Sequence, residues 1–162
     1  MILVPVQVLV NLFIGLLWMF FQDDWGVLTF LNGYLFGIFV IFIIRRLLPS
    51  KFYLFTLYDA LKLFLIFIYE LFTASVVVIG KIIEPKINIK PGIFSLETSL
   101  ESDIEVTLLA LLITLTPGSV VMEISHDNKT FYIHTMDIPE QSDAVLRSTS
   151  RFEEAIKRVT RP

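Results

Sequence analysis

Two apolar runs open the chain, and a short acidic turn separates them. From Ile2 to Phe21, and again from Trp25 to Ile44, no side chain is charged. A helix needs about 20 apolar residues to cross roughly 30 Å of hydrocarbon, so each run is long enough to span a membrane. The pattern predicts a transmembrane helical hairpin within residues 1–48, with a tight connection at Gln22-Asp23-Asp24.

The third apolar segment, from Phe52 to Ile83, carries charges along one side. Asp59, Lys62 and Glu70 are spaced so that they share one side of a helix. A charge in mid-bilayer is costly unless it faces protein or water. Residues 49–84 therefore form either an amphipathic helix in the membrane interface or a third span whose charged side faces partner subunits. We favour the first, because an even number of crossings returns the polar tail to the side of the N-terminus.

Residues 85–162 have the pattern of a small water-facing domain. Lys86–Phe94 predicts a short strand or an extended arm. Ser99 or Ser102 is placed to cap a helix over residues 104–115. That helix has about three turns, so it is too short to cross a membrane and must be buried in the tail or lie on the membrane surface.

The segment after this helix predicts a β-hairpin over residues 119–136. Thr116-Pro117-Gly118 ends the helix, since proline blocks its continuation and glycine permits a reversal. We place the hairpin turn at Asp127-Asn128. The predicted cross-strand pairs are Ile124 with Phe131, Glu123 with Tyr132, Met122 with Ile133, and Val121 with His134.

A final amphipathic helix is predicted over residues 140–159. Its expected apolar positions are Leu146, Phe152, Ile156 and Val159. A two-stranded ribbon is not stable alone in water, so the apolar side of the hairpin is expected to cover helix 104–115. The tail is thus predicted to be a compact α-β-β-α unit.

Composition narrows the class of protein. The chain has 162 residues, 55% of them hydrophobic, and a mean hydropathy of +0.74, which is too apolar for an ordinary soluble domain. A net charge of −3 gives no basic field for nucleic acid. The absence of cysteine excludes disulfides and thiolate chemistry. No nucleophile elbow, phosphate-binding glycine loop or carboxylate pair indicates an enzyme or a cofactor site.

The basic residues predict the topology. Arg45, Arg46 and Lys51 follow the second apolar run, and cytoplasmic loops collect Lys and Arg. This end of the hairpin is therefore expected in the cytoplasm, with the turn at Asp23-Asp24 outside. Both the N-terminus and the C-terminal tail are expected to be cytoplasmic.

Small and polar residues mark a packing face in the hairpin. Asn11 and Trp18 lie on one face of the first helix, and Gly33 and Gly37 form a G-x-x-x-G in the second. Glycines let helices approach closely in lipid. These four residues are therefore interface candidates. Two partners remain open, because the helices either pack on each other or contact another chain.

The remaining polar candidates do not indicate ion chemistry. Three convergent ligands are missing around His126 and His134, so no metal site is predicted. We expect His134 to hydrogen-bond the chain near Thr114–Gly118. In that segment Thr116, Pro117 and Gly118 are expected to serve the folding of the tail. A pH-sensing role for His134 remains an alternative. The two uncharged helices of the hairpin offer no continuous polar path for an ion through the bilayer. The stripe of Asp59, Lys62 and Glu70 is therefore interpreted as an interface with subunits or lipid headgroups.

Several segments together resemble a known family. They are LFIGLLWMF and LNGYLFGIFVIFIIRRL in the first two helices, YELFTASVVVI in the third, and ITLTPGSVV followed by TFYIHTMDI in the tail. In this order they resemble the E subunit of the multisubunit monovalent cation/proton antiporters called Mrp, Mnh or Pha, over nearly the whole chain. The chain has Thr-Pro-Gly-Ser where the family pattern has Thr-Pro-Gly-Thr, a change that keeps a hydroxyl.

The resemblance implies a function in a bacterial cell membrane. Such a complex contains two large subunits similar to the antiporter-like subunits of respiratory complex I, and it exports Na⁺, or in some cases other cations, in exchange for H⁺. The E subunit is a small accessory member that supports assembly, with the other subunits and the lipid bilayer as partners. The alternative function is a self-standing membrane-anchored scaffold whose tail binds a cytoplasmic protein.

Overall fold

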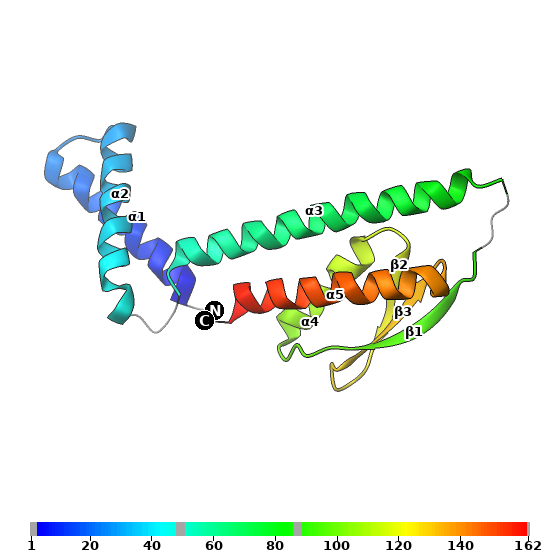
Figure 1. The fold of residues 1–162 in the computed structure, drawn as a ribbon. Coiled ribbons are helices and arrows are strands. Elements are labelled where there is room, and N and C mark those ends of the chain that lie inside the picture. The colour runs from blue at the N-terminus through cyan, green and yellow to red at the C-terminus, as the bar shows by residue number, and fades with distance from the viewer. Residues whose placement is uncertain (1–2, 48–50, 86–88, 162) are drawn as a thin grey trace. The chain divides into compact units, whose positions relative to one another are not determined.

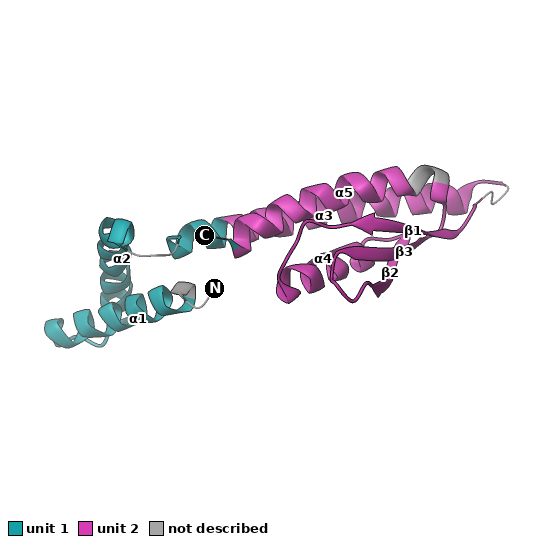
Figure 2. Ribbon diagram, turned by 90° about the horizontal axis from the view of Figure 1, so that it is seen from below, with its two compact units in different colours: residues 1–58, 161–162 teal, residues 59–160 magenta. Residues whose placement is uncertain are grey.

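The computed structural model describes residues 3–47, 51–85 and 89–161, so the boundary expected at residue 48 lies outside the described residues. The chain divides into two compact units, shown in Figure 2. The first contains residues 1–58 and 161–162, and the second contains residues 59–160. Helix α3 (Tyr53–Ile83) begins in the first unit and continues into the second.

The first unit contains the expected helical hairpin of α1 (Leu3–Gln22) and α2 (Val27–Ile44) (Figure 1). Asp23 takes a positive φ of 50° at the reversal. The carboxylate of Asp24 accepts hydrogen bonds from the Gly26 N–H and from the Thr29 hydroxyl, which supplies acceptors at the start of α2. The tight acidic connection predicted from the sequence is confirmed. A short 3₁₀ turn, Arg45–Leu47, follows α2.

Within the described residues, three helices are long and apolar enough to cross a membrane. Their candidate spans are Pro5–Gln22, Val27–Leu47 and Tyr53–Ile83. The first two correspond to the two predicted transmembrane helices. The third contains 31 residues, or roughly 46 Å at 1.5 Å per residue, and it is the helix whose relation to the membrane the sequence left open.

The second unit contains a three-stranded antiparallel sheet in the order β1-β3-β2. The strands are β1 (Gly92–Glu97), β2 (Ser119–Ile124) and β3 (Thr130–Thr135). The strand or arm expected over residues 86–94 begins outside the described residues. Strand β1, which corresponds to it, extends beyond the predicted end to Glu97. Because β1 pairs with β3, β3 is the central strand, and the predicted two-stranded ribbon is part of a larger sheet.

Two of the four predicted cross-strand pairs of the hairpin are observed. Ile124 pairs with Phe131 and Glu123 pairs with Tyr132, as predicted. The two-residue turn expected at Asp127-Asn128 is not observed, because the Asn128 N–H donates to the Ser125 carbonyl at 2.9 Å and closes a turn centred on His126-Asp127. A β-bulge between Val121 and Glu123 then shifts the register, so the pairs expected for Met122 and Val121 are wrong. The structure pairs Val121 with Ile133 and Val120 with His134. The extra residue, Met122, is 61% exposed, and the bulge lets Val121 take the inward position instead.

The turn is fixed by local hydrogen bonds. The Ser125 hydroxyl and the Lys129 N–H both donate to the Asp127 carboxylate, which lowers the pKa of that carboxyl below its ordinary value. Asn128 has a positive φ of 59°, a conformation that Asn tolerates better than most residues.

Helix α4 (Asp103–Leu115) begins at the predicted cap. The Ser102 hydroxyl accepts from the Glu105 N–H at 3.3 Å, and the Glu105 carboxylate accepts from the Ser102 N–H, so the two residues form a capping box. Asp103 and Glu105 lie in the first turn, where carboxylates favour the positive end of the helix dipole.

The core of the second unit lies between the sheet and its helices. Phe131 and Ile133 of β3 pack with α4 and with α5 (Ile138–Thr160), as expected for a hairpin that covers the short apolar helix. Leu146 was expected in this core but is 45% exposed. Val145, one position earlier, is buried instead. The fully buried apolar side chains of this core are Leu109, Ile113, Phe131, Ile133, Phe152 and Ile156.

Helix α3 also contributes to this core, which the sequence did not predict. Leu63 is buried in it, and Ile66 and Phe67 pack against it. Figures 1 and 2 both show α3 and α5 side by side, with their chain directions opposed. Within the second unit, α3 is therefore part of the tail domain.

Candidate functional site

The four interface candidates of the hairpin contact one another. A Cβ added to Gly33 would lie 2.4 Å from Cβ of Trp18, and one added to Gly37 would lie 1.9 Å from Oδ1 of Asn11. Both distances are far below van der Waals contact, so α1 and α2 approach as closely as glycine allows. Of the two partners that the sequence left open for this face, the structure shows the neighbouring helix.

A buried polar cluster lies at the same contact. Asn11 is completely buried, and its Nδ2 donates to the Tyr53 hydroxyl at 2.9 Å. The Tyr53 hydroxyl in turn lies 3.4 Å from the Tyr34 hydroxyl. Oδ1 of Asn11 has no N–H or O–H donor within the described residues, and it points at the Cα of Gly37. Only glycine leaves room for this oxygen, because a side chain at position 37 would begin 1.9 Å from it.

Gln7 extends the cluster by one helical turn. Its Oε1 accepts from the Tyr53 N–H at 3.0 Å, and its Nε2 donates to the Lys51 carbonyl at 3.0 Å. The Tyr53 N–H is one of the first N–H groups of α3, which have no partner inside the helix. Gln7 and Asn11 thus fix the start of α3 to α1. Sequence reasoning missed Gln7, Tyr34 and Tyr53. The available signal was the i, i+4 spacing of Gln7 and Asn11 in an otherwise apolar helix.

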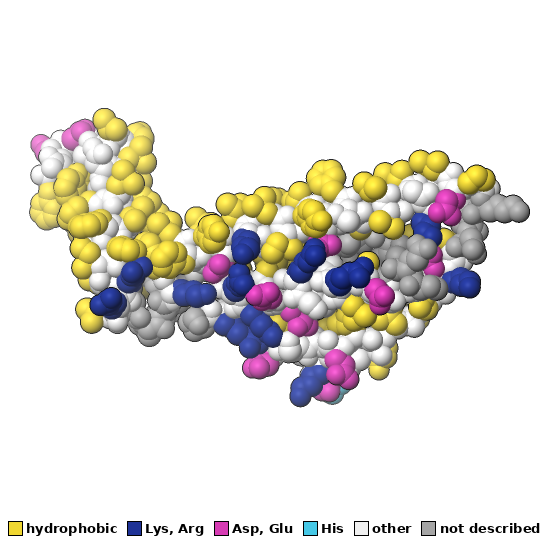
Figure 3. Space-filling view, in the orientation of Figure 1, with side chains coloured by type: hydrophobic (Ala, Val, Ile, Leu, Met, Phe, Trp, Pro, Cys, Tyr) yellow, Lys and Arg dark blue, Asp and Glu magenta, His cyan; other side chains and the backbone are white. Residues whose placement is uncertain are grey.

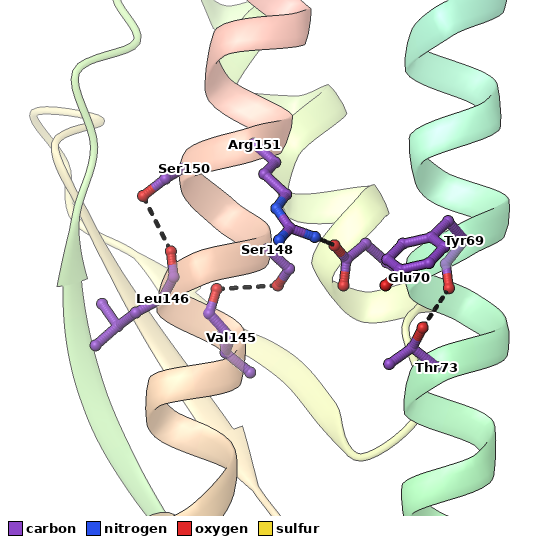
Figure 4. A network of polar contacts seen from close by, with 8 residues as sticks. All are labelled: Tyr69, Glu70, Thr73, Val145, Leu146, Ser148, Ser150 and Arg151. Carbon is purple, nitrogen blue, oxygen red and sulfur yellow. Dashed lines mark hydrogen bonds and ion pairs between the residues drawn. The ribbon is translucent and has the colours of Figure 1, made fainter.

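The charged stripe of α3 faces α5. Glu70 forms an ion pair with Arg151, with 2.7 Å between Oε1 and Nη1, and Figure 4 shows both side chains reaching across the gap between the helices. Asp59 and Lys62 line a shallow hollow with Arg151 and other charged residues of α5. The structure therefore places these three interface candidates against this chain's own tail.

A second ion pair joins the same helices further along. Lys81 Nζ lies 3.4 Å from Oδ2 of Asp137, and both side chains are largely buried. Asp137 directly precedes α5, where a carboxylate favours the helix dipole. Asp59, Glu70 and Lys81 are each 11 residues apart, close to three helical turns, so they share one face of α3. Sequence reasoning included the first two and missed Lys81.

The Thr116-Pro117-Gly118 turn is held by hydroxyl groups and by the neighbouring strand. The Thr116 hydroxyl donates to the Leu112 carbonyl at 2.8 Å, and the Ser119 hydroxyl donates to the Ile113 carbonyl at 3.1 Å. Both carbonyls belong to the last turn of α4, where partners inside the helix are lacking. Gly118 has a φ of 93°, a conformation that L side chains rarely adopt.

A small cavity of about 80 Å³ separates this turn from α3 and α5. Glu70 and Thr73 of α3 line one wall, and Ser148 of α5 lines another. The Ser148 hydroxyl already donates to the Val145 carbonyl at 3.0 Å, as Figure 4 shows. The structure thus brings Glu70 close to the Thr116–Gly118 turn, a juxtaposition that the sequence did not indicate.

The histidines lie away from this turn. His134 is on β3, between Val120 and Ile93 of the flanking strands, on the face opposite the buried Phe131 and Ile133. The hydrogen bond expected from His134 to residues 114–118 is therefore not observed. The Met136 N–H donates to the Gly118 carbonyl instead. Within the described ranges, no three His, Asp or Glu side chains are grouped to hold a metal ion.

Comparison with known proteins identifies the family. Residues 11–159 match the family MNHE, described as Na⁺/H⁺ ion antiporter subunit. The chain belongs to this family. The MNHE match spans both units, and it makes the chain an antiporter subunit, a component of a transporter rather than an enzyme.

Individual relatives support the same family. The chain is 44% identical over 155 residues to the E subunit of the Na⁺/H⁺ antiporter of Bacillus subtilis strain 168, covering 96% of this chain and 98% of the relative. It is 42% identical to the E subunit of the Alkalihalophilus pseudofirmus antiporter, with the same coverage. Among solved structures, it is similar in fold to a chain of the archaeal membrane-bound sulfane sulfur reductase, at 20% identity, a TM-score of 0.55 and coverage of 93% of this chain and 96% of that one.

Proposed function

We propose that this MNHE chain is an accessory, structural subunit of a multisubunit Na⁺/H⁺ antiporter. It contributes surfaces to the complex, and other subunits provide the path for ions. Its N-terminus and its tail lie in the cytoplasm, and its partners are the other membrane subunits and the bilayer. Family membership supports the antiporter assignment over a self-standing scaffold, since the relatives that it resembles are named as subunits.

The observation that carries the accessory role is the use of the polar groups in the hairpin. An ion crossing roughly 30 Å of hydrocarbon needs polar groups or water along its whole path. Gln7 and Asn11 lie one turn apart near the start of α1, and both bond the chain around Tyr53. From Leu12 to Phe21, α1 carries no polar group in its side chains other than the Trp18 indole N–H. On α2 the polar side chains are Thr29, Asn32 and Tyr34, and neither helix carries a charged side chain, so the hairpin alone offers an ion few polar groups and no charged partner.

The charges of the second unit support the same role. Glu70 and Lys81 are ion-paired with residues of the tail, and Asp59 lies in a hollow lined by α5 residues. These pairs fasten two helices of one chain. A transport site would instead offer a carboxylate to the ion, together with a route from each side of the membrane.

Reconstitution tests this function directly. The purified chain is placed in liposomes that contain a pH-sensitive dye, and the whole complex is reconstituted with and without it. The expected result is no Na⁺-driven pH change from the chain alone, and loss of antiport when the chain is omitted, with poorer recovery of the large subunits. A pH change from the chain alone that Glu70→Gln abolishes would overturn the accessory role.

A further inference from the structure

Helix α3 has two unlike faces in the second unit. One face packs on the tail through Leu63, and on it Glu70 and Lys81 form their ion pairs. The opposite face is exposed and apolar along its whole length, and Figure 3 shows hydrophobic side chains along the edge of α3 away from α5. We call this face the apolar stripe. It consists of Leu61, Leu65, Tyr69, Phe72, Val76, Ile79 and Ile83.

The contact between α3 and the tail is nearly as long as a bilayer is thick. It extends from the hollow at Asp59 to the ion pair at Lys81, which is 22 residues, or roughly 33 Å along the helix. If α3 crossed the membrane, α5 beside it would have to cross as well. The hydrocarbon core is about 30 Å thick, so this length leaves little of the contact outside it.

Helix α5 carries too many charged side chains to lie in the hydrocarbon core of a membrane. Between residues 147 and 158 it has six charged side chains, which are Arg147, Arg151, Glu153, Glu154, Lys157 and Arg158. Charged groups are strongly unfavourable at the centre of a bilayer. The packing of α3 on the tail therefore excludes a crossing by residues 59–83 while this unit stays folded.

The start of α3 lies at one end of the membrane hairpin. Tyr53 bonds Gln7 and Asn11 near the beginning of α1, and it packs in a cluster with Ile41 near the end of α2. Arg45 and Arg46 follow directly, as basic residues do at the cytoplasmic surface of a membrane. Helix α3 thus begins at the level of the lipid headgroups, where anionic lipids attract basic side chains.

We propose that α3 lies in the plane of the membrane and that its apolar stripe is buried in the cytoplasmic leaflet. The folded tail then covers the other side of α3 and faces water. The composition of the stripe indicates lipid rather than another protein, because contacts between membrane helices are enriched in small residues and none of the seven is Gly, Ala or Ser. Tyr69, at one margin of the stripe, has the amphipathic ring that favours the interface.

Depth measurements in a bilayer test this proposal. The chain contains no cysteine, so single cysteines at Leu61, Leu65, Phe72 and Ile79 accept one nitroxide label each. Electron paramagnetic resonance then compares collisions with oxygen and with a water-soluble nickel chelate, first for the full chain in lipid nanodiscs and then for the assembled complex. A matched series on exposed positions of α1, at Leu9, Phe13 and Phe20, calibrates the depth scale.

An in-plane helix gives one depth at all four α3 positions, about 5–10 Å below the headgroups, while the α1 series varies with position. A spanning helix gives different depths, since Leu61 and Ile79 are roughly 27 Å apart along the axis. That gradient would overturn the proposal. Labels in the complex that lose access to both oxygen and nickel would overturn it too, because a protein partner would then cover the stripe.

Discussion

Replacement of Gly37 by alanine tests whether the glycine face holds the hairpin together. The added Cβ would lie 1.9 Å from Oδ1 of Asn11, about 1.5 Å short of an ordinary contact at 3.4 Å. The Asn11 side chain is fully buried and donates to Tyr53, so it has no room to withdraw without losing that hydrogen bond. The two helices must separate, or the polar cluster must break.

The expected loss follows from two opposing effects. Overpacking of a well-packed contact costs about 1–3 kcal/mol. Alanine is a better helix former than glycine by up to about 1 kcal/mol, which offsets part of this cost. We expect Gly37→Ala to lower the free energy of unfolding of the hairpin by about 1–2 kcal/mol. Gly33→Ala should act in the same direction, because its Cβ would meet Cβ and Cγ of Trp18.

Gly80→Ala is the matched control. Gly80 also lies inside a helix, but an added Cβ there meets nothing within 4 Å. It should leave stability unchanged or raise it slightly. Stability is measured by titrating the chain in mild micelles with sodium dodecyl sulfate and following the fluorescence of Trp18, whose ring lies 5.0 Å from that of Phe36. Trp25→Phe removes the second tryptophan signal.

One outcome would refute the reasoning. If Gly37→Ala unfolds at the same detergent fraction as Gly80→Ala, α1 and α2 do not pack through this face. If the same variant then also fails to assemble with the other subunits, the glycine face belongs to a contact between chains.

Three further predictions concern topology, the tail and the ion pair. A cysteine at Asp23 should react with a membrane-impermeant maleimide added to intact cells and one at Ser142 should not; the reverse pattern would overturn the topology. Gly118→Val should destabilise the second unit by about 1–3 kcal/mol, because the φ of 93° at this position strains a β-branched residue, and Gly118→Asn should cost less. Thermal unfolding measures both variants. A valine variant that assembles normally but does not transport would contradict a folding role. Glu70→Gln should lower the free energy of unfolding by less than about 1 kcal/mol, since its partner Arg151 is 56% exposed, and it should leave antiport by the complex intact. A double-mutant cycle with Arg151→Ala measures the coupling energy between the two side chains. A coupling energy of zero would mean that the ion pair is adventitious.

Much of the fold could be predicted because hydrophobic period and turn chemistry agree along the chain. The charge-free runs and the Ser102 cap each have a local physical cause, and each is observed. The hairpin reverses near Asp127 as expected, but its turn is centred on His126-Asp127, one residue earlier than predicted. The bulge at Met122 could not be predicted, since an alternating strand with one extra residue has the same apolar composition as one without. The choice of Val145 over Leu146 for the core likewise depends on how α5 rotates against the sheet.

The interface candidates show a different limit. The sequence identified Asn11, Trp18, Gly33 and Gly37 as a packing face, and the structure shows that they contact one another. Small residues signal close approach but do not name the partner, because the same glycine suits a helix of its own chain or of another. The missing information was the Tyr53 hydroxyl, which lies 42 residues from Asn11 and binds it.

Helix α3 shows why periodicity alone could not decide its environment. An apolar stripe faces either lipid or a protein core, and a charged stripe faces water, a partner or its own chain. In α3 the apolar residues fall on two different faces, since Leu63 is buried in the tail core while Leu65, two residues later, is 59% exposed. The partner of the charged stripe lies about 80 residues downstream, at Arg151, beyond the reach of any local pattern. Once that contact is known, the charges of α5 limit the environment of α3, because a helix packed along α5 would have to carry those charges with it across the hydrocarbon core.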